Sequence, residues 1–247
     1  MGIIRFSDDE VFSTDSSEYD ILINAALKIK DVSGAIVEIG TRRGGSAKMI
    51  IDALYQNNDC NRSMFCIDPY GNIDYEYTNK AAVAHNLNVK LTDNVEEMIS
   101  TDITSKVKLG YDNTVRNRIV PSLYYYAFQK GIDFQFFFLE DTEFFKRYTD
   151  GVPVYNNVKS LVNDYSLVFF DGPHTNNHIK NEIDFFEPRM NKGSIMVFDD
   201  IWMYDHDMIE NDYLFTNGFK TVARGNIKAS YVKESWDSYR SYCHNYF

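Results

Sequence analysis

The sequence predicts an α/β protein built on a doubly wound, mostly parallel sheet, and two observations carry this prediction. Short apolar runs recur along the chain, and each ends in a small or acidic residue. Continuous runs of this kind are typical of strands that are covered on both faces. Segments with apolar residues at helical spacing stand between the runs, and this alternation favours parallel strands joined by right-handed crossovers.

The expected elements can be placed along the chain. Strands are predicted at residues 35–40, 64–68, 134–139, 166–171 and 194–199. Helices are predicted at residues 19–29, 46–54 and 175–186, the last ended by Pro188. Two further strands, predicted at residues 218–223 and 227–233, are expected to form an antiparallel pair.

Residues 72–132 break this alternation. The segment is long, polar and rich in Asn and Tyr, with a helix expected at residues 116–129. A structureless loop of that length is unusual in a compact domain. We therefore interpret it as a helical cap inserted into a single domain of residues 1–247, with a plain surface insertion as the equally weighted alternative.

The composition excludes several classes of protein. The chain has 247 residues, of which 44% are hydrophobic and 15% aromatic, as in globular proteins. Its formal net charge of -11 disfavours a broad nucleic-acid interface, because phosphate binding needs a concentrated basic face. There is no signal-peptide pattern, no apolar run long enough to span a bilayer, and no disulfide or zinc pattern among the three cysteines. We expect a cytoplasmic protein that binds neither nucleic acid nor membranes, and a homo-oligomer is left open.

A glycine-rich turn follows the first predicted strand. Gly40 permits a tight turn, and Gly44 and Gly45 would let a ligand approach the backbone where the next helix starts. Glu38 could accept hydrogen bonds from a ligand ammonium or from loop amides. Many nucleotide-binding proteins share such a turn, and a mere tight turn is the alternative.

Acidic residues follow the second and third predicted strands. Asp68 stands 28 residues after Gly40, where an acid can accept hydrogen bonds from both ribose hydroxyls of an adenosine cofactor. The cofactor could be NAD or S-adenosylmethionine, but the glycine spacing departs from the dinucleotide pattern and weakens NAD. Either Glu140 or Asp141 could bond the adenine amino group, although Asp141 could equally cap a helix beginning near Thr142.

Three more acids follow the last two strands of the parallel set. Asp171, Asp199 and Asp200 would repel one another unless a cation or a network of donors neutralised them. Oxygen ligands favour Mg²⁺ over zinc, and helix capping without a metal is the alternative. His174 could take a proton from a substrate hydroxyl, whereas a zinc site of His174 with His178 is disfavoured because a third soft ligand is missing.

These motifs, in this order, resemble the macrocin O-methyltransferase family. The resemblance rests on Val-Glu-Ile-Gly-Thr-x-x-Gly-Gly-Ser, Ile-Asp, Phe-Asp-Gly-x-His and Gly-Ser-Ile-Met-Val-Phe-Asp-Asp, and it covers residues 33–71 and 133–205. The family belongs to the class I S-adenosylmethionine-dependent methyltransferases, which have a Rossmann-like fold, and is related to the cephalosporin hydroxylase-like proteins.

The resemblance implies roles for particular residues. The predicted cofactor-binding residues are Glu38, Gly40, Thr41, Gly44, Gly45, Ser46, Asp68, Glu140, Asp141 and Asp171. Asp171, Asp199 and Asp200 match the magnesium-binding acids of the family, and His174 matches the general base of some members, with Asp171 beside it. Other members carry an acid at the position of Pro173, so that version of the base is absent here. His174 is then the candidate base, with the alternative that metal ligation alone acidifies the hydroxyl.

The function implied is transfer of a methyl group from S-adenosylmethionine to a hydroxyl of a small molecule. The resemblance further implies a sugar or polyol acceptor whose hydroxyls are held by Mg²⁺. The alternatives are a hydroxylase-like relative, a nicotinamide-dependent oxidoreductase, and a non-catalytic protein that binds a ligand or partner.

Overall fold

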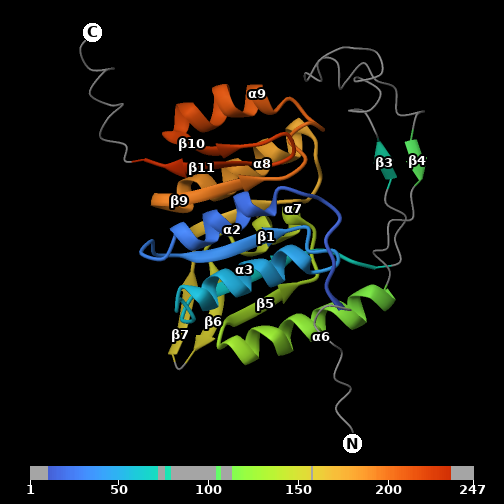
Figure 1. Ribbon diagram of the computed structural model, residues 1–247, viewed down its shortest axis with the longest axis vertical. Helices are drawn as coiled ribbons and strands as arrows, with labels where there is room; N and C mark the ends of the chain where they lie inside the picture. The colour runs from blue at the N-terminus through green and yellow to red at the C-terminus, as the bar shows by residue number, and fades with distance from the viewer. Residues whose placement is uncertain (1–10, 72–75, 79–103, 107–112, 157, 235–247) are drawn as a thin grey trace, which may run out of the picture.

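The computed structural model describes residues 11–71, 76–78, 104–106, 113–156 and 158–234, and a seven-stranded sheet forms its centre (Figure 1). In spatial order, its strands are β10 (Phe219–Arg224), β11 (Ala229–Lys233), β9 (Met190–Phe198), β8 (Tyr165–Phe170), β1 (Ala35–Ile39), β2 (Ser63–Ile67) and β5 (Asp133–Phe137). Strands β9, β8, β1, β2 and β5 are parallel, while β11 is antiparallel to both β9 and β10. The predicted fold class is confirmed.

The order of the strands places a ligand site. From β1 the chain builds outward through β2 and β5 on one side, and through β8 and β9 on the other. The crossovers therefore diverge between β1 and β8. In open α/β sheets a crevice forms at that point, beyond the carboxyl ends of the strands.

Helices cover both faces of the sheet (Figure 1). On one face lie α2 (Tyr19–Lys28), α3 (Gly45–Gln56) and α6 (Asn113–Lys130). On the other lie α7 (Asp141–Arg147), α8 (Asn176–Phe186) and the helical turns α9 (His206–Met208), η3 (Ile209–Leu214) and η4 (Phe215–Asn217), with η2 (Glu187–Arg189) continuing α8. None of the helices in the described ranges is long and apolar enough to cross a membrane.

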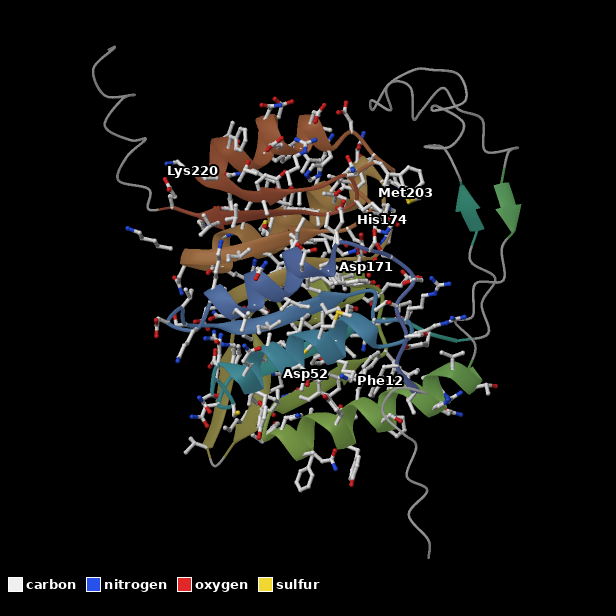
Figure 2. The ribbon with its side chains drawn as sticks, viewed as in Figure 1. Phe12, Asp52, Asp171, His174, Met203 and Lys220 are labelled. Carbon is white, nitrogen blue, oxygen red and sulfur yellow. The ribbon has the colours of Figure 1, made fainter. Side chains whose placement is uncertain are left out.

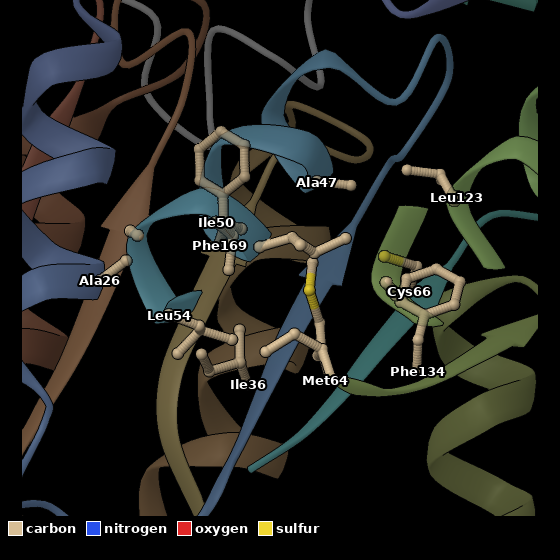
Figure 3. Close-up of a cluster of buried hydrophobic side chains, with 14 of the residues drawn as sticks. Ala26, Ile36, Ala47, Ile50, Leu54, Met64, Cys66, Leu123, Phe134 and Phe169 are labelled. Atoms are coloured by element: carbon tan, nitrogen blue, oxygen red, sulfur yellow. The ribbon is translucent and has the colours of Figure 1, made fainter. Parts of the chain in front are cut away.

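Alternate residues of each central strand pack into two separate hydrophobic cores, one on each face of the sheet. In β1, Val37 and Ile39 join the core under α7 and α8, whereas Ile36 joins the core under α2, α3 and α6. Figure 3 shows the second of these cores, where Ile36 and Met64 of the sheet meet Leu54 of α3. Burial on both faces explains why these strands are continuous apolar runs.

The predicted elements agree with the structure to within a few residues, except in the expected cap. The helix predicted at residues 116–129 is α6, and its residues Ile119, Leu123 and Ala127 pack into the core beside α3. It is thus part of the layer that covers the sheet, not of a cap. Of the remainder, the structure describes β3 (Glu76–Thr78) and β4 (Thr104–Lys106), which pair antiparallel; residues 72–75, 79–103 and 107–112 lie outside the described residues.

Sequence reasoning missed one hairpin, which strands β6 (Val152–Asn156) and β7 (Val158–Val162) form between α7 and β8. Its inward residues Val152 and Val154 are buried, whereas β7 is largely exposed. The two strands are short and half exposed, so they lack the continuous apolar run that identifies the central strands.

Candidate active site

The first residue after each parallel strand lies at one edge of the sheet. Backbone hydrogen bonds continue the strand pairing there: Gly40 N to Ile67 O at 2.9 Å, Asp171 N to Ile39 O at 3.0 Å, and Asp199 N to Phe170 O at 2.9 Å. The strand ends are therefore in register. Predicted site residues that are far apart in the sequence become neighbours along this edge, where Asp171 and His174 lie close together (Figure 2).

Asp68 is held by two backbone amides. Its Oδ2 accepts from Arg42 N at 2.9 Å, and its Oδ1 accepts from Tyr70 N at 3.0 Å. Burial raises the pKa of Asp68 to about 6, although these bonds oppose the shift. Each carboxylate oxygen can accept more than one hydrogen bond. Asp68 thus ties the turn after β1 to the loop after β2 and keeps acceptor capacity for a diol.

Glu38 lies fully buried beneath the glycine-rich turn. Cys66 Sγ donates to its Oε2 at 3.2 Å, while within the described residues Glu38 Oε1 and Thr41 Oγ1 have no hydrogen-bond partner. Ser46 is buried in the first turn of α3 beside them. Buried polar atoms rarely remain unpaired. Ser46 and Thr41 nevertheless lie close enough to lower the pKa of Glu38, so the three side chains form one buried polar group that would suit a ligand ammonium.

The burial of Glu38 predicts a pH dependence of stability. Desolvation raises its pKa from the ordinary value of 4.5 to about 7. The folded state therefore binds the proton of the Glu38 carboxyl more tightly than the unfolded state does. The stabilisation that results is fully present below pH 4.5 and is lost as the pH rises through about 7. We expect Glu38→Gln to reduce the fall in unfolding free energy between acid and neutral pH by about 3 kcal/mol.

Urea unfolding across this pH range measures the effect. Glu140→Gln, at an exposed position before α7, is the matched control and should follow the wild-type pH profile. Equal pH profiles for Glu38→Gln and the wild type would contradict the proposed burial effect.

The chain itself fills the space beside the predicted ligand-cradling glycines. A Cβ on Gly45 would come within 2.6 Å of Ser13 O, and one on Gly44 within 3.1 Å of Phe12 Cδ1 and Ile119 Cγ2. Both glycines thus allow close packing of the segment before α2, and Gly44 also that of α6. A glycine in the sequence shows that something approaches closely, but not whether it is a ligand or another part of the chain.

A glycine is required at position 40 because the turns after β1 and β8 are in close contact there. Gly40 has a φ of 85°, and a Cβ there would lie only 1.9 Å from Asp171 O. The turns after β1 and β8 therefore touch through their backbones, which holds Asp171 beside the turn that carries Thr41.

Glu140 and Asp141 differ in environment. Glu140 is exposed and precedes α7 without a side-chain cap bond, whereas Asp141 is buried and accepts from Thr142 N at 2.7 Å through Oδ1. Asp141 also faces Glu182 of α8, whose pKa is raised well above its usual range by burial and then by Asp141. The adenine-binding role of this pair remains a prediction.

The three carboxylates predicted to bind a metal do converge, but one of them is already paired. Asp199 is fully buried, and its Oδ1 accepts from Lys228 Nζ at 2.7 Å, from Ser16 Oγ at 3.1 Å and from Asp200 N at 2.7 Å. Burial and the neighbouring Asp199 raise the pKa of Asp171 well above its usual range. A lysine ammonium thus stands where sequence reasoning predicted a metal ion.

His174 lies between the other two carboxylates. Its Nε2 is 3.8 Å from Asp171 Oδ1 and 3.6 Å from Asp200 Oδ2, and its ring is parallel to that of Tyr204. Burial lowers the pKa of His174, with the neighbouring carboxylates opposing the shift. An imidazole that is neutral at pH 7 and lies beside carboxylates can accept a proton from a substrate.

His178 and the residues after Asp200 have structural roles. His178 Nδ1 lies 2.8 Å from Thr175 Oγ1, and α8 begins only at Asn176, so His174 and His178 do not share a helical face. His206 is buried in the core and contacts Tyr204 and Tyr231 through its two ring nitrogens. Trp202, in contrast, is half exposed and donates to Asp200 Oδ1 at 3.3 Å.

Several backbones at this edge are strained. Arg42, Tyr70 and Asp200 follow β1, β2 and β9, and all three have φ between 42° and 45°. Such conformations cost of order 1–3 kcal/mol each and gather at functional sites. This strain is independent of the side-chain chemistry, and it points to the same edge of the sheet.

Comparison with known proteins gives the family. Residues 37–201 match the family model described as a methyltransferase domain, a span that includes β1, β2, β5, β8, β9 and the turns that follow them. This chain belongs to the methyltransferase-domain family. Membership supports S-adenosylmethionine as the cofactor of this methyltransferase.

Solved structures share the fold at low identity. The O-methyltransferase NovP has a TM-score of 0.51 and 14% identity, covering 88% of this chain and 79% of its own. The calicheamicin methyltransferase CalS11 has a TM-score of 0.52 and 15% identity, covering 86% of this chain and 78% of its own. No curated protein matches the sequence.

The predicted magnesium set does not fit this methyltransferase as it stands. In the described ranges, no three His, Cys, Asp or Glu side chains are grouped so that they could hold a metal ion. Asp199 Oδ2 is buried without a partner among the described residues, but Lys228 already holds the other oxygen of that carboxylate. The arrangement gives one carboxylate paired with a fixed cation and two that lie beside His174, not three carboxylates without a cation.

Sequence reasoning missed Lys228, Ser16 and Tyr19, which also lie at this site. Lys228 Nζ donates to Ser16 Oγ at 2.8 Å and lies 4.2 Å from the ring centroid of Tyr19. The charges of Asp171, Asp199 and Glu38 contribute to raising the pKa of the Tyr19 phenol, after burial. The position of Lys228 next to an apolar strand was only a weak indication of a role at the site. Nothing in the sequence indicated that the segment before α2 returns to this edge.

Proposed function

We propose that this methyltransferase transfers the methyl group of S-adenosylmethionine to a hydroxyl of a small molecule, with a sugar or polyol as the acceptor class. The observation that carries the proposal is the meeting of two sets of residues at one sheet edge. Asp68, Glu38 and Thr41 offer oxygen atoms that suit the ribose and ammonium of the cofactor. His174, Asp171 and Asp200 suit an acceptor hydroxyl, and Asp171 follows β8, whose end touches the turn of Gly40 and Thr41.

The mechanism follows from the positions of these residues. When bound, S-adenosylmethionine supplies a methyl group on a positively charged sulfur. Asp68 would hold the ribose, and Glu38 would accept from the ammonium of the methionine part. Fixing both ends of the cofactor orients the methyl for in-line attack, and orientation is a large part of such a rate enhancement.

His174 would act as the general base. In the tautomer that carries its hydrogen on Nε2, facing Asp171 and Asp200, Nδ1 is the basic atom; it is buried and has no hydrogen-bond partner within the described residues. The imidazole of His174 would take the proton that the acceptor hydroxyl gives up when it receives the methyl group, and the sulfur of the cofactor would keep the bonding electrons. The two carboxylates stabilise the imidazolium that forms. The products are a methyl ether and S-adenosylhomocysteine.

The acceptor class is supported by chemistry and by one relative. Asp171 and Asp200 keep 20% and 30% of their side chains exposed, so their oxygens can accept hydrogen bonds from neighbouring hydroxyls of a polyol. A second structure of CalS11, with a TM-score of 0.51, is described as a TDP-rhamnose 3'-O-methyltransferase. Magnesium, which the resemblance implies for this step, is not part of the proposal because Lys228 already holds Asp199.

His174 is the residue on which the chemical step depends. We expect His174→Gln to lower kcat about 10²–10⁴-fold, which is the rate enhancement that a general base typically contributes. The affinity for S-adenosylhomocysteine should stay unchanged. Transfer of radiolabelled methyl to a panel of sugars and polyols, followed by product analysis, measures the rate. His178→Gln is the matched control, since His178 bonds Thr175 and should leave kcat at the wild-type value. An equal loss of kcat in His174→Gln and His178→Gln would argue against His174 as the general base.

A further inference from the structure

We infer that the ammonium of Lys228 takes the place of a divalent cation in this site, holding Asp199 as a positioning residue, so that the protein excludes metal from the carboxylates. This inference rests on the proposed function, since it concerns the same site. The first support is geometric. The side chains of Lys228 and Asp199 are 0% and 1% exposed, and Nζ lies 2.7 Å from Oδ1.

The ammonium is surrounded on its other sides as well. It donates to Ser16 Oγ at 2.8 Å and lies 4.2 Å from the ring centroid of Tyr19 and 5.9 Å from that of Phe169. Hydroxyl, carboxylate and aromatic faces are all groups that stabilise a cation. The structure therefore provides a complete environment for a buried positive charge.

The turn that carries Lys228 is itself fixed. Glu18 accepts from three consecutive backbone amides, Asn226 N at 3.0 Å, Ile227 N at 2.9 Å and Lys228 N at 2.9 Å. Glu18 adopts a positive φ of 57° to do so. The segment before α2 thus contacts both the backbone of this turn, through Glu18, and the side chain of Lys228, through Ser16.

The charges at the three carboxylates determine whether a divalent cation can also bind there. Three carboxylates converge here, and an isolated buried carboxylate is costly unless it is paired. Lys228 supplies the positive charge that pairs with Asp199, whereas the neutral imidazole of His174 lies between Asp171 and Asp200. A divalent cation bound by Asp199 would share that carboxylate with the ammonium, and the two like charges would repel at short range.

The role in methyl transfer follows from the orientation of Asp199. Its Oδ1 accepts all three donors, whereas Oδ2 is buried and has no partner in the part of the chain that the structure describes. Lys228 therefore fixes the orientation of this buried carboxylate at the end of β9, next to the Asp200 backbone.

The test is Mn²⁺ binding to the full-length protein after treatment with EDTA, followed by electron paramagnetic resonance. We expect the wild type to bind no Mn²⁺ at this site. Lys228→Met keeps the length of the side chain and removes the charge, so Mn²⁺ affinity should rise about tenfold or more. The gain should disappear in Lys228→Met/Asp199→Asn, and Lys228→Arg, which keeps the charge, should remain free of Mn²⁺.

Two results would overturn the inference. One is a wild type that binds one Mn²⁺ per chain and loses it in Asp199→Asn, a measurement that does not depend on whether Lys228→Met folds. The other is a folded Lys228→Met that gains no affinity for Mn²⁺. S-adenosylhomocysteine binding, titrated in parallel with and without EDTA, tests the proposed function separately, because its loss would remove the methyltransferase assignment and leave the Mn²⁺ result standing.

Discussion

Gly40→Ala should disrupt this protein more than any other single methyl addition at the sheet edge. The new Cβ would lie 1.9 Å from Asp171 O and 2.5 Å from Asp171 C, so the ends of β1 and β8 would have to separate. The residue would also be held at a φ of 85°, which side chains rarely adopt. Backbone strain and overpacking together predict a loss of about 3–5 kcal/mol in the free energy of unfolding. Binding of S-adenosylhomocysteine should fall with it.

A variant at a second glycine distinguishes the effect of backbone strain from the effect of overpacking. Gly131 has a φ of 71°, but among the described residues a Cβ there meets only Cys60 Cβ, at 3.9 Å. Gly131→Ala should therefore cost only the strain of about 1–2 kcal/mol and leave ligand binding intact. Urea unfolding and calorimetric titration of both variants make the comparison. Equal losses of stability would show that the contact between the turns after β1 and β8 does not matter.

The second large effect is expected at the buried ion pair. Lys228→Met leaves the fully buried Asp199 carboxylate without its cation, and breaking a buried pair in this way typically costs about 3–5 kcal/mol. Most of that cost reflects the charge left behind. The double variant Lys228→Met/Asp199→Asn should therefore recover a large part of the lost stability.

An exposed ion pair supplies the control. Lys220 and Glu234 form a pair at 2.6 Å with 62% and 42% of their side chains exposed. Figure 2 shows Lys220 away from Asp171 and His174. Lys220→Met should change the unfolding free energy by no more than about 1 kcal/mol. A double-mutant cycle by denaturant unfolding gives both values, and additive effects at Lys228 and Asp199 would mean that the two side chains are not coupled.

The fold was predictable because its signals are local. Val37 and Phe169 stand in apolar runs that are continuous since both faces of the sheet are covered, and this pattern can be read without knowing any contact. The acids at strand ends were predictable for the same reason. The edge position of Asp68, Asp171 and Asp199 follows from the strands alone.

What could not be predicted depends on residues that are distant in the sequence. Ser16 and Lys228 are 212 positions apart, and their contact with Asp199 arises only when the segment before α2 and the turn before β11 meet at the sheet edge. Gly45 shows the same limit, since its sequence context suited a ligand but Ser13 fills the space. Helix α6 was read as part of a cap because its polar and aromatic surface hides a narrow apolar face around Leu123.

The central claim is that this edge of the sheet binds the methyl donor, and calorimetric titration with S-adenosylhomocysteine tests it most directly. We expect saturable binding to the wild type, no response to NADH, and an affinity about 10–100-fold weaker in Asp68→Asn, since a charge-assisted hydrogen bond is worth about 1.5–3 kcal/mol. Asp133→Asn, at the start of β5 on the opposite edge, should bind as the wild type does. Absence of S-adenosylhomocysteine binding, or equal affinities for Asp68→Asn and the wild type, would contradict the account.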